Sequence, residues 1–146
     1  RSNNGMDLNR DYSSEKSDKT IFHKRALEKF GVPDMSILIH EDWSSDGFYM
    51  YDQCDSNSQS QNIINKVSQY FPINTHRKID RHKTSTPGII TPMKQHFNHK
   101  KWPEAIWLWE EGCPQNYTLE TPSEFPIKRR VEVLTSVVNQ LIESLY

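Results

Sequence analysis

The stretch Ser36-Ile37-Leu38-Ile39-His40-Glu41-Asp42, followed by Trp43, decides how the rest of this sequence is interpreted. Its short apolar run is bounded upstream by Gly31 and Pro33 and stops abruptly at a histidine and two acids. A short apolar run between turn residues is typical of a buried strand. Because open α/β sheets bind ligands beyond the C-terminal ends of their strands, we expect His40 to be a metal ligand at such an end.

The segments on both sides of this stretch alternate between strand and helix patterns. Apolar residues three and four apart indicate helices, whereas short apolar or aromatic runs indicate strands. The predicted helices cover residues 16–30, 62–71 and 127–145, and the predicted strands cover residues 47–51, 105–109 and 116–120. This order predicts an α/β fold with a mixed, twisted β-sheet flanked by helices.

The final helix has the clearest pattern in the chain, because six apolar residues recur along it at helical spacing. They are Ile127, Val131, Leu134, Val138, Leu141 and Leu145. By contrast, residues 73–103 look irregular apart from Ile89 and Ile90. Compact domains usually keep their loops short, so a stretch of this length is expected to be functional.

Composition excludes several classes of function. The 146 residues fit one ordinary domain, and a net charge of -1 favours neither a nucleic acid nor a membrane surface as a partner. The longest apolar runs are too short to span a membrane. Cys54 and Cys113 have no Cys-x-x-Cys spacing, and two free thiols in a cytoplasmic protein are the simplest interpretation.

His40 has the chemistry of a zinc ligand if it lies at a strand end. A neutral imidazole in a fixed position binds Zn²⁺ well, and its second nitrogen can be held by an acceptor. The adjacent Glu41 and Asp42 could orient the ring or remain solvated. The alternative is a histidine that only caps the end of the strand through hydrogen bonds.

Glu120 follows the buried-strand pattern of residues 116–119 and is a candidate general base. Burial disfavours the charged form of a carboxylate and so raises its pKa toward the range useful for proton transfer. Such a group could take a proton from a metal-bound water and pass it to a leaving nitrogen. The alternative is a glutamate paired with an arginine or lysine at the sheet edge.

Asn9 and Arg10 are candidates for binding a substrate carboxylate. The planar guanidinium of arginine matches a carboxylate, and the neighbouring amide adds further donors. The alternative is a structural salt bridge from Arg10 to Asp7 or Asp11.

The order of these groups resembles a known family. The segment Gly5-Met6-Asp7-Leu8-Asn9-Arg10-Asp11-Tyr12 resembles the Gly-x-Asp-Leu-Asn-Arg-Asn/Asp-Phe/Tyr motif of the zinc carboxypeptidase family. His40 then stands where this metallocarboxypeptidase family has a zinc-binding histidine, and Glu120 stands where it has its catalytic glutamate. The sequences of residues 40–49 and 118–123 look most like the microbial branch of the family that is close to succinylglutamate desuccinylase and aspartoacylase.

The resemblance implies roles residue by residue. His40 would bind zinc, Glu120 would act as general base and acid, and Arg10 with Asn9 would hold the substrate carboxylate. Arg1 would match an arginine that polarises the scissile carbonyl. The implied activity is zinc-dependent hydrolysis of an amide bond, either at a peptide C-terminus or in an N-acyl amino acid with a free carboxylate.

Two features depart from the family pattern. The other two zinc ligands come from a His-x-x-Glu motif upstream of the Asn-Arg motif, and no His-x-x-Glu occurs in this chain. The spacings of the loop histidines, His76, His82, His96 and His99, match no closed zinc site. The second departure is a missing tyrosine. The carboxypeptidases use a tyrosine from a loop before the catalytic glutamate, and in that place this chain has Phe97-Asn98-His99-Lys100.

We therefore expect residues 1–146 to be the C-terminal part of one zinc carboxypeptidase-like catalytic domain, incomplete at its N-terminus. One imidazole does not hold zinc tightly, so the isolated chain is expected to be inactive and free of metal. One rival is a non-catalytic, metal-deficient relative that keeps Asn9 and Arg10 to bind acidic ligands. Another is a purely structural α/β domain.

Overall fold

A computed structural model describes residues 5–55, 58–93 and 101–146. The chain divides into two compact units: unit 1 is Arg1–Ser36 with Met93–Asn116, and unit 2 is Ile37–Pro92 with Tyr117–Tyr146. The division into two units does not test whether residues 1–146 belong to a single catalytic domain, which stays a prediction. No helix in the described residues is both long enough and apolar enough for a membrane crossing.

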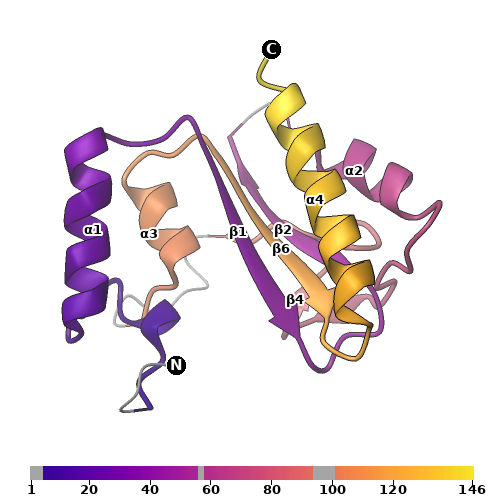
Figure 1. The fold of residues 1–146 in the computed structure, drawn as a ribbon, viewed down its shortest axis with the longest axis horizontal. Helices are drawn as coiled ribbons and strands as arrows, with labels where there is room; N and C mark the ends of the chain where they lie inside the picture. Colours follow the sequence, from indigo (N-terminus) through magenta and orange to yellow (C-terminus); the bar gives the residue numbers. More distant parts are fainter. Residues whose placement is uncertain (1–4, 56–57, 94–100) are drawn as a thin grey trace. The chain divides into compact units, whose positions relative to one another are not determined.

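Unit 1 contains the short 3₁₀ helix η1 (Leu8–Arg10) and the α-helices α1 (Asp18–Phe30) and α3 (Glu104–Glu110), shown in Figure 1. The helix predicted over residues 16–30 is confirmed as α1. It ends at Gly31, whose φ of 85° favours glycine because side chains crowd the backbone in that region.

The strand predicted over residues 105–109 is wrong, because these residues form α3. Ala105, Ile106, Trp107 and Leu108 are all buried, so no polar face interrupts the apolar run. A short, fully buried helix and a short, fully buried strand have the same apolar pattern, and periodicity cannot separate them.

Unit 2 is built on a four-stranded sheet with the order β1-β6-β2-β5, in which β1 and β6 begin in unit 1. The strands are β1 (Met35–Asp42), β2 (Tyr49–Cys54), β5 (Ile89–Ile90) and β6 (Gln115–Pro122). β2 pairs in parallel with β5, and in Figure 1 the arrow of β2 points opposite to those of β1 and β6. The predicted mixed sheet is confirmed, as are the strands predicted at residues 47–51 and 116–120.

The prediction that the decisive stretch forms a strand is confirmed, but the prediction that this strand is buried is wrong. β1 lies at an edge of the described sheet, and none of its residues is fully buried. Ile39 is 55% exposed and Trp43 is 81% exposed. An apolar run shows that a segment suits a strand, but its position within a sheet depends on distant pairings.

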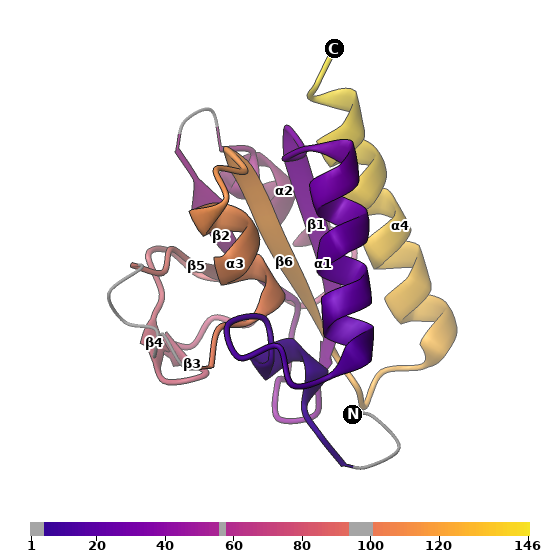
Figure 2. The same ribbon diagram turned by 90° about the vertical axis from the view of Figure 1, so that its left-hand side faces the viewer.

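Two helices of unit 2, α2 (Ser60–Val67) and α4 (Ile127–Glu143), contact each other, and α2 also contacts β2 and β5 (Figure 2). The final helix is therefore confirmed, and its predicted apolar face is confirmed only in part, because Leu141 is fully buried and Leu134 and Val138 are half-buried. Val133, Val137 and Leu141 are fully buried, whereas Ile127 and Val131 are exposed. Two overlapping apolar stripes run along α4, and spacing alone does not show which one packs.

The region predicted to be irregular, residues 73–103, has more structure than expected in its described part. β3 (Lys78–Ile79) and β4 (His82–Lys83) form an antiparallel pair, with Asp80 and Arg81 at positive φ between them. Ile90 packs in a buried cluster with Tyr49 and Ile79. The apolar pair at residues 89–90 is therefore part of the core of unit 2.

Candidate functional site

His40 and Glu120 are brought together by the pairing of β1 with β6. The Ser123 amide donates to the Asp42 carbonyl oxygen at 3.0 Å, and the Thr121 hydroxyl donates to the His40 carbonyl oxygen at 3.4 Å. These bonds advance in the same direction along both strands, as parallel neighbours require. The register therefore places the ends of β1 and β6 side by side.

At this edge the Nδ1 atom of His40 lies 4.0 Å from Oε1 of Glu120. The side chain of Glu120 is only 12% exposed, and that of His40 is 32% exposed. An imidazole and a sheltered carboxylate that converge from two strand ends have the composition of a proton-transfer or metal site. The two side chains are far apart in the sequence, so only the fold brings them together.

Glu41 points to a different partner from that of His40. Its carboxylate pairs with the guanidinium of Arg130, whose Nε also donates to the Phe125 carbonyl oxygen at 2.9 Å. Successive side chains of a strand point to opposite faces, which separates Glu41 from the His40 side. Glu41 therefore joins the end of β1 to the start of α4 rather than orienting the imidazole.

Asp42 accepts hydrogen bonds from two sides. The Tyr49 hydroxyl donates to Oδ2 at 3.0 Å, and the Ser44 amide and hydroxyl donate to Oδ1 at 2.8 and 2.7 Å. Burial, followed by the negative charges of Glu120 and other neighbours, raises the pKa of Tyr49. The hydroxyl of Tyr49 therefore stays protonated and remains a donor. Sequence patterns marked Tyr49 only as part of a strand.

Asn9 and Arg10 lie in unit 1, in η1. The Oδ1 atom of Asn9 accepts from the Glu104 amide at 3.0 Å, which ties η1 to the start of α3. The Asp7 side chain accepts from the Asn9 amide at 3.1 Å. The side-chain oxygen of Asn9 therefore has a structural partner, and the two N–H donors of its Nδ2 are the part suited to a ligand.

Arg10 does not form the structural salt bridge weighed as its alternative, as far as the described residues show. Its Nη1 donates to the neighbouring Asn9 carbonyl oxygen at 3.3 Å, and the residue is exposed. The carboxylate of Asp11 instead accepts from the Ser14 hydroxyl and from the Lys16 and Ser17 amides. The guanidinium is available for an acidic ligand.

Several predicted features lie outside the described residues: Arg1, His96, and the Phe97–Lys100 segment that stands where the family has a tyrosine. Of the described loop histidines, His76 is exposed and lies 3.7 Å from Asp46. Within the described ranges no three His, Cys, Asp or Glu side chains form a group that could hold a metal. Neither Cys54 nor Cys113 forms a disulfide, in agreement with the prediction.

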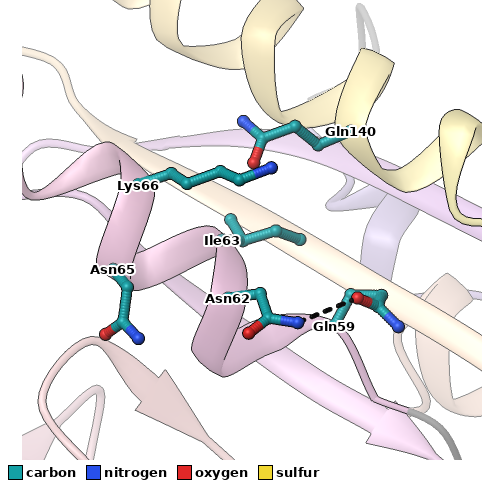
Figure 3. Close-up of a pocket in the computed structure, with 6 residues that line it drawn as sticks. All are labelled: Gln59, Asn62, Ile63, Asn65, Lys66 and Gln140. Atoms are coloured by element: carbon teal, nitrogen blue, oxygen red, sulfur yellow. Dashed lines mark hydrogen bonds between the residues drawn. The ribbon is translucent and has the colours of Figure 1, made fainter.

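A hollow of about 260 Å³ lies elsewhere in unit 2, between α2 and α4 (Figure 3). Its lining residues are Gln59, Asn62, Ile63, Asn65, Lys66 and Gln140. It contains neither His40 nor Glu120, and Lys66 is its only charged lining residue. We place the candidate site at the ends of β1 and β6, because reactive groups converge there.

Comparison with known proteins shows likeness at the level of structure. The chain is similar to a putative metallopeptidase of Shewanella denitrificans, with a TM-score of 0.77 and 22% identity over 97% of this chain and 53% of that one. It is also similar to a putative metallopeptidase of Shewanella amazonensis, with a TM-score of 0.73 and 20% identity over 90% of this chain and 49% of that one. A putative metallopeptidase of Shewanella baltica matches with a TM-score of 0.65 and 22% identity over 84% of this chain and 44% of that one.

No protein-family model matches the sequence, and no curated protein matches it. The chain spans about half the length of the Shewanella proteins. At these identities the comparison shows the fold: an α/β fold with a mixed sheet flanked by helices, which this chain shares with about half of each Shewanella protein.

Proposed function

We propose that this chain belongs to a zinc-dependent hydrolase of amide bonds and supplies its general base, one metal ligand and part of its substrate-binding surface. The observation that carries the proposal is the 4.0 Å separation between Nδ1 of His40 and Oε1 of Glu120 at neighbouring strand ends. The structural likeness to metallopeptidases supports the same reaction class.

In this proposal Glu120 is the general base and the general acid. Its carboxylate takes a proton from the attacking water and returns it to the leaving nitrogen, a role that contributes roughly 10²–10⁴-fold to rate. Its low exposure keeps bulk water from competing for the same proton. Arg10, with the Nδ2 donors of Asn9, binds the substrate carboxylate, and Arg1 is the proposed partner of the scissile carbonyl. The substrate is a peptide C-terminus or an N-acyl amino acid.

The metal-binding side chains of the described residues can be compared with the ligands that a catalytic zinc site needs. A catalytic zinc site uses three protein ligands, and the described residues provide the imidazole of His40 without a group of three. The described residues therefore do not complete a zinc site. We propose that His40 is one ligand and that the others lie outside these 146 residues. Bound zinc would lower the pKa of water and polarise the carbonyl.

The test uses the full-length protein loaded with zinc, with hippuryl-L-phenylalanine and N-acetyl-L-glutamate as probes. Glu120→Gln should lower kcat by about 10²–10⁴-fold while leaving the fold intact, because the amide cannot accept the proton. Glu124→Gln is the matched control, because Glu124 is exposed in the turn that follows β6. Equal rates in Glu120→Gln and the wild type would refute the proposed base.

A second candidate is a non-catalytic relative that binds carboxylates without metal. The absence of a three-ligand group in the described residues favours it, and the exposed Arg10 suits it equally well. The upstream coding sequence separates the two, because a His-x-x-Glu within ~100 residues, a distance that fits one domain, would support the enzyme. Calorimetry on the isolated 146 residues should show no tight zinc binding, and tight binding would contradict our assignment of the missing ligands.

A further inference from the structure

The hydrogen bond between Tyr49 and Asp42 joins two strands that are not neighbours. Tyr49 begins β2, Asp42 ends β1, and β6 lies between these strands in the sheet. Adjacent strands lie about 4.8 Å apart, so the two backbones are separated by roughly 10 Å. The 3.0 Å bond between the side chains therefore requires the phenol of Tyr49 to cross β6.

The face of β6 that the phenol crosses is the one that carries Glu120. Asp42 lies two residues after His40 on β1, and residues two apart point to the same face of a strand. His40 in turn faces Glu120 at 4.0 Å. The side chain of Tyr49 therefore crosses β6 on the face that carries Glu120. Tyr49 is only 2% exposed, so it excludes water along this path.

From this geometry we infer that Tyr49 is a positioning residue for Glu120. Its ring closes the β2 side of the carboxylate, and its hydroxyl, anchored on Asp42, fixes the ring. The carboxylate is thereby held toward His40 and away from bulk water. The negative charge of Glu120 is one of the causes that raise the pKa of Tyr49, in agreement with this proximity. The inference rests on the proposed function, since it assigns a task to the proposed base.

Tyr51 provides a matched control on the same strand. Its ring lies 5.9 Å from that of Tyr49, but its hydroxyl donates to Asp80, between β3 and β4, at 2.8 Å. Tyr49→Phe and Tyr51→Phe each remove one hydroxyl from one hydrogen bond to a carboxylate. Only the first removes a link that crosses β6.

The test measures kcat and KM for hippuryl-L-phenylalanine and N-acetyl-L-glutamate with the zinc-loaded full-length protein. Tyr49→Phe should lower kcat about tenfold with KM within twofold, because misplacing a reacting group slows chemistry rather than substrate binding. Asp42→Ala should have the same effect, and the double variant should be no slower than either single variant, since both act through one bond. Tyr51→Phe should leave both parameters unchanged.

The possible failures are distinguishable. A wild-type protein that hydrolyses neither probe overturns the proposed function, and this inference falls with it. An active wild type with unchanged kcat in Tyr49→Phe overturns the inference alone. So does a double variant whose loss is the product of the two single losses. Loss of kcat with an equal fall in Tyr51→Phe would show a general effect on the fold and would also overturn it. Circular dichroism and thermal melting of each variant accompany the kinetics.

Discussion

The candidate base and the candidate substrate clamp are held by different kinds of structure. His40 and Glu120 lie on neighbouring strands, and the backbone pairing of β1 with β6 sets their 4.0 Å separation. Asn9 and Arg10 lie in a single turn of 3₁₀ helix in unit 1. Apart from its backbone bonds, from the Arg10 amide to Asp7 and from the Asp11 amide to Leu8, that turn is held by individual side-chain bonds, including the one from the Glu104 amide to Asn9.

This difference indicates where each part is vulnerable. A pair of side chains positioned by strand register is disturbed only by changes that displace the backbone, because many backbone hydrogen bonds together fix that register. A turn held by single bonds loses much of its support when one polar side chain is removed, because the groups left behind are unsatisfied. Measurements of the free energy of unfolding separate these two kinds of support.

Gly47→Ala should give the largest loss, because Gly47 precedes β2 in a backbone contact without room for a side chain. A Cβ atom there would lie 2.4 Å from the Asn74 amide nitrogen and the Ile73 carbonyl carbon. Forcing an extra carbon into such a contact costs about 3 kcal/mol. We expect the free energy of unfolding to fall by about that amount in urea denaturation.

The control for this change is the neighbouring Asp46→Ala. Asp46 is exposed, and its pair with His76 is a surface contact, so the loss should stay below about 0.5 kcal/mol. If Gly47→Ala were as stable as Asp46→Ala, the contact of Gly47 with Ile73 and Asn74 would have room for a side chain, contrary to the distances above.

Sequence patterns predicted the regular elements of this fold better than their packing. The helix at residues 16–30 and the strand at 116–120 follow from local spacing and from turn residues such as Gly31. The exposure of Ile39 does not follow, because its place at a sheet edge depends on which distant strand pairs with β1. The buried stripe of α4 was predicted only in part, because Val133 and Val137 lie on a second apolar stripe with the same helical period.

The candidate site was predicted from its order in the chain, not from its geometry. His40 and Glu120 stand at strand ends, and their approach depends on a parallel pairing that no local pattern specifies. Tyr49 was missed because an aromatic residue in a strand normally packs in the core. Its bond to Asp42 could have been suspected only once the order β1-β6-β2 was known.

Asp11→Asn tests the loop side of the contrast. The carboxylate of Asp11, which is 2% exposed, accepts from the Ser14 hydroxyl at 2.7 Å and from the Lys16 and Ser17 amides at 2.9 and 2.8 Å. The side-chain amide of asparagine has one acceptor oxygen, where the carboxylate has two. Its NH₂ group would face the N–H and O–H donors that now bond to the carboxylate. We expect the free energy of unfolding at pH 7 to fall by about 2 kcal/mol, as for a disrupted buried hydrogen-bond group.

The same residue predicts a pH dependence. Burial acts to raise the pKa of Asp11, but the hydrogen bonds from Ser14, Lys16 and Ser17 outweigh it, and the pKa lies below its ordinary value. Its contribution is therefore complete above the unfolded-chain pKa of about 3.9 and is lost as the pH falls through the lower folded value. The gap between wild type and Asp11→Asn should narrow below pH 4. A gap that widens in acid would contradict this sign.

Asn9→Ala and Arg10→Ala should show the smallest effects on stability and should separate structure from binding within one turn. Asn9→Ala leaves the Glu104 amide without its side-chain acceptor, as in the loss of a helix cap, and should cost about 1 kcal/mol. Arg10→Ala removes an exposed group bonded only to the adjacent carbonyl among the described residues, and should cost less than about 0.5 kcal/mol. Urea denaturation measures both. If Arg10→Ala proved the more destabilising of the two, Arg10 would be a structural residue, and its assignment to a substrate carboxylate would lose its support.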